Sequence, residues 1–400
     1  MSLVCIGALI ATACGSDSKP TSSSSGSSAA PANTTPLDVV AIVAKSGPAA
    51  PGEAGSLVGL QAAVDQINAS GGVQGRQIKL EVIDSQGDAT KGASALQQRL
   101  DAGPKPDLVW HSSLSAVTLA LLPILTDAKI VSIGGSASGA INAPDKFPYG
   151  FSVALPVTAH AKAMTNALVT AGAKKVGLMT TNDAFGQSAQ TEYTKAMQAA
   201  GLEVTTAQYG AADVDDRGPM QGLLDSKPDH LALMSYGPAT ARLFQARSDL
   251  GVTLPTIGDP VMAASSFDAI PAAQFTGVTL VSYKIEQEQS DADRTAAQKA
   301  FFSLIAKAGG FNKQGAPLFA LGYDGIQVWA LAVKQAGTAD ADAVKAAFES
   351  LKAPSEVPYV GYAQLSFSAQ NHFPSPDVTK DYAVLVPGPV NADGQLKKGS

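Results

Sequence analysis

Hydroxyl-bearing side chains follow two predicted buried strands in the first part of the chain. His111–Ser115 (HSSLS) comes directly after one strand, and Gly134–Ser138 (GGSAS) comes after the next. We expect Ser115 to be the N-cap of the following helix, whose free N–H groups favour an anion. With the Ser136 and Ser138 hydroxyl groups, the two loops could hold a carboxylate without a positively charged side chain. Alternatively, these serines only cap helices.

Aromatic and acidic residues follow three strands predicted later in the chain. Phe185 lies in the loop at 181–186 (TNDAFG) and Tyr236 in the loop at 235–238 (SYGP), so both could form an apolar or stacking wall for a ligand. Asp259 follows the next strand, in a Gly-Asp-Pro sequence, and its carboxylate could pair with a ligand ammonium. Gly-Asp-Pro also favours turns, so Asp259 could instead only form the turn.

A hydrolase site is the enzymatic interpretation that the same residues allow. Gly134–Ser138 misses the G-x-S-x-G nucleophile motif because Ser138 fills the last glycine position. The nearest alternative is Ser115 or Ser136 acting with His111 as base. The four histidines show no metal-ligand spacing, and neither a P-loop nor a G-x-G-x-x-G motif follows a strand. We therefore expect a protein that is not an enzyme and holds no metal or cofactor.

Composition excludes two further classes of function. The net charge is −6 and the sequence has no basic cluster, which argues against nucleic-acid binding. Cys5 and Cys14 are the only cysteines, and both lie near the N-terminus. The rest of the chain therefore has no thiol chemistry, and a chain of this length buries a core large enough to fold without disulfides.

Strand and helix patterns alternate along the chain from residue 37. A first series ends near residue 133, a second runs from 175 to 283, and long helical patterns follow at 292–307 and 318–335. Such alternation predicts parallel sheets covered by helices on both faces, and two series predict two α/β lobes. In open α/β sheets, ligands bind where loops leave the carboxyl ends of the strands. The polar loops described above lie at those ends.

The N-terminus has the pattern of an export signal. Residues 3–13 (LVCIGALIATA) are apolar but too few to span a bilayer, and small residues lead from Ala11 to Cys14. The Ser-rich stretch at 16–36 cannot repay the entropy of ordering. We expect a signal peptide at 1–13, a lipidated Cys14, and a disordered tether at 14–36. The alternative is an ordinary secretory signal with an incidental cysteine.

Four motifs resemble those of a known family. They are Ser46-Gly47-Pro48, the helix end Ile67–Arg76 (INASGGVQGR), Asp84–Asp88 (DSQGD) and Asp183–Gln187 (DAFGQ). Together they resemble the type I solute-binding proteins, the branched-chain-amino-acid (Leu/Ile/Val) receptors of ABC importers. The similarity runs from about residue 37 to about residue 370 and is strongest in its first 55 residues.

The resemblance implies a fold and a division of the chain. The family fold is α/β, with two doubly wound parallel-sheet lobes joined by a three-strand hinge that closes on the ligand. Lobe 1 would comprise residues 37–154 and about 284–355, and lobe 2 about 155–283 and 356–395.

The resemblance also implies a set of ligand-binding residues. The first-lobe loops would bind the carboxylate and ammonium of the ligand, and Phe185 would cover it. Tyr236 would lie where the family has a second-lobe Tyr or Gly, and Asp259 would meet the ammonium. The full set is Ser115, Ser136, Ala137, Ser138, Phe185, Tyr236 and Asp259.

The sequence departs from the family pattern at three places. Trp110-His111 replaces the usual glycine of the first ligand loop, Gly134-Gly135 replaces Ser/Thr-Pro, and Pro51 stands where an aromatic residue is common. Trp110 could narrow the pocket, stack on a flat ligand, or pack in the core. Urea, short amides and small organic acids therefore stay open as ligands beside amino acids.

The function that the resemblance implies is solute capture outside the cytoplasm. The expected protein is a monomer, anchored to the membrane by lipid, that delivers a small solute to an ABC permease. The alternative is a sensor of the same fold that passes its signal to a partner protein.

Overall fold

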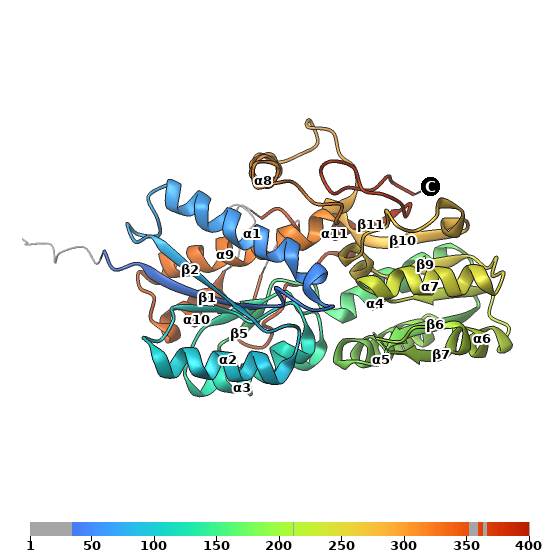
Figure 1. The fold of residues 1–400 in the computed structure, drawn as a ribbon, viewed down its shortest axis with the longest axis horizontal. Helices are drawn as coiled ribbons and strands as arrows, with labels where there is room; N and C mark the ends of the chain where they lie inside the picture. Colours follow the sequence, from blue (N-terminus) through green and yellow to red (C-terminus); the bar gives the residue numbers. More distant parts are fainter. Residues whose placement is uncertain (1–33, 211, 352–358, 363–365, 400) are drawn as a thin grey trace, which may run out of the picture. The chain divides into compact units, whose positions relative to one another are not determined.

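Residues 34–399, except 211, 352–358 and 363–365, are described by a computed structural model. Cys14 and nearly all of the expected leader and tether lie outside these residues. The described residues form two β-sheets, each covered by helices on both faces (Figure 1). The expected α/β class with two parallel-sheet lobes is confirmed.

The first sheet is parallel throughout, with strand order β2-β1-β3-β4-β5. Its strands are β1 (Leu37–Val43), β2 (Ile78–Asp84), β3 (Leu108–Trp110), β4 (Ser132–Gly134) and β5 (Gly150–Ser152). Its first helices are α1 (Ala50–Ala69), α2 (Ala89–Ala102) and α3 (Ser115–Asp127). Figure 1 shows α1 on one side of β1, with α2 and α3 on the other.

The central strand β1 has apolar residues on both faces. Val39 and Ala41 join the core beneath α1, whereas Val40 and Ile42 join the core beneath α2 and α3. Successive side chains of a strand point to opposite faces, so a strand covered on both sides is apolar throughout.

A helix from the far end of the chain completes the first lobe. α9 (Ala316–Ala336) packs against α1 so closely that a Cβ on Gly59 would lie 2.0 Å from the Phe319 oxygen. A Cβ on Gly322 would lie equally close to the Ser56 oxygen, at 2.0 Å. The two glycines thus let the two backbones touch. α9 is the one described helix that is long and apolar enough to cross a membrane, but 83% of that stretch is buried in this core.

The second sheet has strand order β11-β10-β9-β8-β6-β7, and only β11 runs antiparallel to its neighbour. Its strands are β6 (Lys175–Thr181), β7 (Glu203–Tyr209), β8 (His230–Leu233), β9 (Thr256–Gly258), β10 (Val278–Tyr283) and β11 (Tyr382–Leu385). Its helices are α4 (Val157–Thr170), α5 (Ala184–Ala199), α6 (Arg217–Asp225) and α7 (Pro238–Asp249). α4 and α5 share a core on one face of the sheet, and α6 and α7 share a core on the other.

The chain passes between the two sheets more than once. It leaves the first sheet between β5 and α4 and returns after β10 into the remaining long helices, which pack with α1 and with one another. It rejoins the second sheet at β11. These long helices are α8 (Ala296–Lys307), α9 and α10 (Ala341–Ser350). The remaining elements are short: α11 (Val378–Asp381) and the 3-10 turns η1 (Gly139–Ile141), η2 (Pro260–Ala264), η3 (Ala272–Phe275) and η4 (Lys284–Glu286).

Candidate functional site

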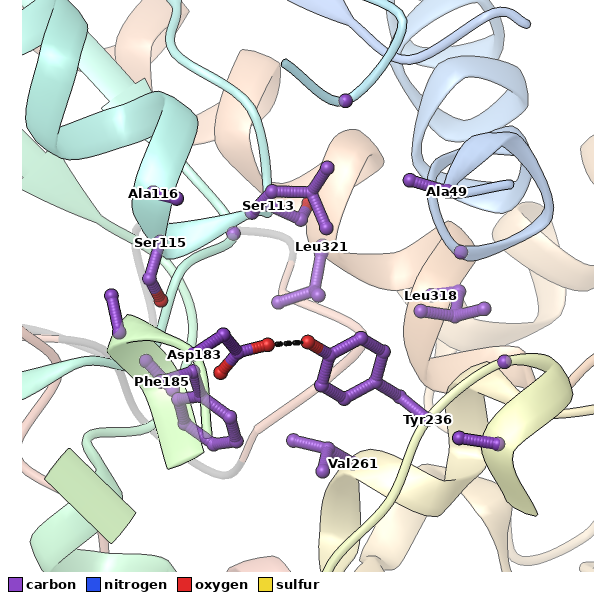
Figure 2. Close-up of a pocket in the computed structure, with 18 of the residues that line it drawn as sticks. Ala49, Ser113, Ser115, Ala116, Asp183, Phe185, Tyr236, Val261, Leu318 and Leu321 are labelled. Carbon is purple, nitrogen blue, oxygen red and sulfur yellow. Dashed lines mark hydrogen bonds between the residues drawn. The ribbon is translucent and has the colours of Figure 1, made fainter. Parts of the chain in front are cut away.

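A cavity of about 450 Å³ lies where the carboxyl ends of strands from both sheets meet. Its size falls within the range of about 300–1,000 Å³ typical of small-molecule sites. Figure 2 shows Ser113, Ser115, Ala49, Leu318 and Leu321 from the first lobe around the cavity. Asp183, Phe185, Tyr236 and Val261 come from the second lobe. Both lobes therefore contribute to one site.

The beginning of helix α3 forms the polar part of the first-lobe wall. Ser113 to Ala116 line the cavity, and the helix begins at Ser115 with Leu114 as N-cap. The prediction of Ser115 as N-cap is wrong by one residue, because the Ser112 hydroxyl accepts from the Leu114 amide at 3.0 Å and fixes the helix start there. Among the described residues, no side chain caps this helix end. Its first-turn N–H groups thus stay available to an anion beside the Ser115 hydroxyl.

Ser136 lies behind Ser115. The two hydroxyl oxygens are 2.7 Å apart, and the Ser136 side chain is fully buried. Ser138 is also fully buried and caps the short turn η1 through the Ala140 amide. Of the predicted serine loop, only Ala137 lines the cavity, together with Gly135. The expected presentation of the Ser136 and Ser138 hydroxyl groups is therefore not seen; Ser136 orients Ser115 instead.

Phe185 and Tyr236 line the second-lobe wall, as expected, and Asp183 lies between them (Figure 2). Asp183 caps helix α5: its Oδ1 accepts from the Gly186 amide at 2.8 Å and from the Thr181 hydroxyl at 3.0 Å. Its Oδ2 accepts from the Tyr236 hydroxyl.

Asp183 was not predicted as a site residue, although its motif is visible in the sequence. A residue that caps a helix has the same sequence signature whether or not its second oxygen faces a ligand. Among the described residues that line the cavity, Asp183 is the one charged side chain.

Asp259 does not line the cavity, contrary to the sequence-based expectation. Its side chain is 1% exposed and accepts hydrogen bonds from the Tyr193 hydroxyl at 2.8 Å and the Val261 amide at 3.1 Å. Burial raises the pKa of Asp259 to about 8. It begins the turn η2 and points into the core toward α5, whereas the next residues, Pro260 and Val261, face the cavity.

His111 and Gly134, two of the departures from the family pattern, fit against each other. His111 is fully buried, and its Nε2–H donates to the Phe151 carbonyl at 2.8 Å. A Cβ on Gly134 would lie 2.3 Å from the His111 Nδ1. The imidazole thus fills the space that a larger residue at position 134 would need. Trp110 packs in the core against Gly325 of α9, where a Cβ would lie 2.6 Å from the ring.

The same geometry argues against the hydrolase interpretation. His111 Nε2 is bonded to Phe151, and the Ser115 hydroxyl is bonded to Ser136 rather than to an imidazole. Burial lowers the pKa of His111 to about 4, so the ring is a poor base near neutral pH. Within the part of the chain that the structure describes, no group of three His, Cys, Asp or Glu residues could hold a metal.

The remainder of the cavity wall is apolar. Leu318 and Leu321 come from α9, Pro48 and Ala49 from the start of α1, and Val261 from η2. The α9 residues were not predicted as site residues, because their sequence has only the pattern of a buried helix. The cavity can accept an apolar body together with an anionic group at α3 and a cationic or hydrogen-bonding group at Asp183.

Comparison with known proteins extends over nearly the whole described chain. A family model described as "Periplasmic binding protein" matches residues 36–379. A Leu/Ile/Val-binding protein of Rhizobium johnstonii is 25% identical over 308 residues, which cover 75% of this chain and 79% of that protein.

Solved structures show the same fold. The branched-chain amino acid binding protein LivJ of Streptococcus pneumoniae, in complex with isoleucine, superposes with a TM-score of 0.71 at 21% identity, covering 90% of this chain and 97% of that one. A solute-binding protein of Rhodopseudomonas palustris, in complex with 4-hydroxybenzoate, superposes with a TM-score of 0.73 at 20% identity. That match covers 92% of this chain and 96% of the other.

Proposed function

This chain belongs to the periplasmic binding protein family, and on that premise we propose that it is an extracytoplasmic receptor that captures an amino acid of the branched-chain type for an ABC importer. The Rhizobium relative and the isoleucine-bound LivJ structure support the ligand class. The observation that carries the proposal is the cavity, which combines uncapped N–H groups at α3, a carboxylate at Asp183 and an apolar wall from α9.

Ligand capture follows from the way the two lobes share the cavity. The ligand carboxylate binds at the first turn of α3 and the Ser115 hydroxyl, and the aliphatic side chain packs against Leu318, Leu321 and Phe185. Only contacts that are stronger in the closed state can favour closure, and here each lobe supplies part of them. The closed form then delivers the solute to a membrane permease without chemical turnover.

Proposals on domain limits and attachment accompany this function. We assign residues 37–154 and about 284–355 to lobe 1, and about 155–283 together with 356–395 to lobe 2, except for the part around Val360 and His372. There the chain contacts lobe 1, because Asp324 of α9 accepts from the Val360 amide and the Ser152 amide of β5 donates to the His372 carbonyl. Residues 1–13 would be removed as a signal peptide, and a lipid on Cys14 would hold the protein at the membrane through the tether at 14–36.

A ligand panel on the purified full chain tests the function. Leucine, isoleucine and valine should each raise the melting temperature, since a ligand at 100 times its dissociation constant adds about 2.7 kcal/mol to the free energy of unfolding. Urea, acetamide and lysine serve as controls. Urea and acetamide are polar but lack the branched aliphatic side chain, and lysine carries an additional positive charge. A stabilisation by urea or acetamide, with none by the three amino acids, would contradict the proposed ligand.

Aromatic acids are the second candidate class. Phe185 and Tyr236 place two rings on one wall of the cavity, and the related Rhodopseudomonas structure contains 4-hydroxybenzoate. Including 4-hydroxybenzoate and phenylalanine in the panel separates the classes. A shift with the hydroxybenzoate but not with leucine would favour the aromatic class.

A further inference from the structure

We infer that Asp183 is the cation-binding residue of the cavity, and that the Tyr236 hydroxyl holds the place of the ligand ammonium in the ligand-free protein. This inference rests on the proposed function and names the residue that makes the site select a ligand with a positive charge. It transfers the role expected of Asp259 to a different carboxylate.

The two oxygens of Asp183 have different surroundings. Oδ1 is held by the Gly186 amide at 2.8 Å and the Thr181 hydroxyl at 3.0 Å, which fix the orientation of the carboxylate. Oδ2 receives the Tyr236 hydroxyl, and Figure 2 shows this contact exposed to the cavity. The backbone allows this arrangement because position 186 is glycine: a Cβ there would lie 1.9 Å from the Thr181 oxygen.

The charge of Asp183 lacks a cationic partner in the wall. Among the described residues that line the cavity there is no Lys, Arg or His, and all the donors to Asp183 are neutral. Closure of the lobes excludes water and strengthens every electrostatic interaction inside the site. An ammonium group on the ligand supplies the missing positive charge, whereas a ligand with only a carboxylate would add a second negative charge.

Asp259 cannot take this role in the same geometry. Its two oxygens are occupied by the Tyr193 hydroxyl and the Val261 amide, and its side chain does not reach the cavity wall. The two carboxylates therefore offer a matched comparison, since both begin a helical turn and both accept from a tyrosine hydroxyl.

The Tyr236 hydroxyl marks where the cation sits. An ammonium group adds the attraction between two opposite charges to its hydrogen bond with the carboxylate, which the neutral phenol lacks, so a ligand ammonium displaces the phenol from Oδ2. Tyr236 then keeps its ring against the ligand. Without the Tyr236 hydroxyl, the ligand ammonium no longer competes with another donor for Asp183 Oδ2. Tyr236→Phe should therefore bind leucine about two- to tenfold more tightly.

Isothermal titration calorimetry with leucine, 4-methylpentanoate and 3-methylbutylamine tests the inference on the full chain. These three probes share the branched body and differ in which charged groups they carry. Asp183→Asn keeps a good helix cap but loses the charge, and it should weaken leucine binding roughly a hundredfold or more. It should also abolish the preference for leucine over 4-methylpentanoate. Asp259→Asn, the matched control, should change leucine affinity less than about threefold.

The outcomes separate this inference from the proposed function. If the wild type binds leucine and Asp183→Asn binds it equally well, the inference is overturned while the proposed function stands. If 3-methylbutylamine binds in an Asp183-dependent manner but leucine does not bind, the cation site is supported and the proposed ligand is wrong. If the wild type prefers 4-methylpentanoate to leucine, both are overturned.

Discussion

The Glu53 carboxylate accepts a hydrogen bond from the Ser113 amide at 2.5 Å and so ties the first turn of α1 to the loop that leads into α3. It also accepts from the Ser112 hydroxyl at 2.6 Å and from the Ala44 amide at 2.5 Å. Glu53 is 1% exposed, and its burial raises its pKa. Two segments that line the cavity, at the starts of α1 and α3, are therefore held by one side chain that does not line it.

Glu53→Ala should destabilise the protein and loosen the site together. Two buried donors and the half-buried Ser113 amide lose their acceptor, and each unsatisfied buried group costs about 1–3 kcal/mol. Urea denaturation should show a loss of at least about 3 kcal/mol in the free energy of unfolding. Gln61→Ala, at an exposed position of the same helix, should change it by less than about 0.5 kcal/mol. Equal effects of the two substitutions would show that Glu53 does not hold these segments.

Ser115→Ala should weaken ligand binding without unfolding the protein. The substitution removes a hydroxyl from the cavity wall and leaves the buried Ser136 hydroxyl without its partner at 2.7 Å. The expected loss is about 1–3 kcal/mol of binding free energy, measured by calorimetry with the best ligand of the panel. Ser248→Ala, on the exposed face of α7, is the control and should leave affinity unchanged. An unchanged affinity in Ser115→Ala would remove Ser115 from the site.

Gly134→Ala should be strongly destabilising, because its new Cβ would lie 2.3 Å from His111 Nδ1 and 2.5 Å from the Ser112 oxygen. The double substitution His111→Ala with Gly134→Ala should restore part of the stability that Gly134→Ala loses. Thermal unfolding of both single variants and the double variant gives the coupling energy between the two positions. Strictly additive losses would contradict the complementary fit.

The buried Asp259 should make stability depend on pH. Its pKa is raised to about 8 by burial, so its neutral form stabilises the fold fully below about pH 4, and this contribution is lost as the pH rises through 8. Glu286 and Asp324 act in the same direction, with pKa values raised by burial to about 7. The buried His111 and His160 act in the opposite direction below about pH 6.5, because burial lowers their pKa.

Comparison with Asp259→Asn isolates the Asp259 contribution from the other groups. The wild type should lose stability relative to this variant between pH 5 and pH 8, on the order of a few kcal/mol. Urea unfolding at a series of pH values measures it. If the difference in unfolding free energy between the two proteins stays constant from pH 5 to pH 8, Asp259 is ionised in the folded state at every pH in this range.

Cys14→Ser should release the protein from the membrane. The proposed lipid is attached at this cysteine, and multiple acyl chains are what makes such anchoring stable. Detergent phase partition of the expressed protein should move from the detergent phase to the aqueous phase. Cys5→Ser, inside the expected signal peptide, should leave the partition unchanged. Aqueous partition of the wild type would instead support an ordinary secretory signal.

The fold was largely predictable, because apolar periodicity reports local structure. The first predicted series, from residue 37 to about 133, contains β1 to β4, and the second, from 175 to 283, contains β6 to β10; β5 (Gly150–Ser152) lies outside both. That strand has three residues, and neither it nor α4 after it was predicted.

The site was predictable only in part. Ser115, Ala137, Phe185 and Tyr236 line the cavity because loops at the carboxyl ends of parallel strands converge. Which loop side chains face inward depends on turn geometry that one sequence does not reveal, and this is why Asp259 points into the core. The α9 contribution depends on a helix pairing between distant segments, for which local patterns carry no signal.

The pairing of α1 with α9 also determines when the first lobe can finish folding during synthesis. The Ser56 hydroxyl donates to the Leu318 carbonyl, across a sequence separation of 262 residues. Contacts of such long range form late, because the entropy cost of closing a large loop comes before the contacts stabilise the fold. The first lobe, although it begins at residue 37, therefore lacks one wall of its core until α9 has been synthesised. A nascent chain of this kind cannot complete its first lobe over most of its length, which is compatible with the proposed export of the chain before it folds.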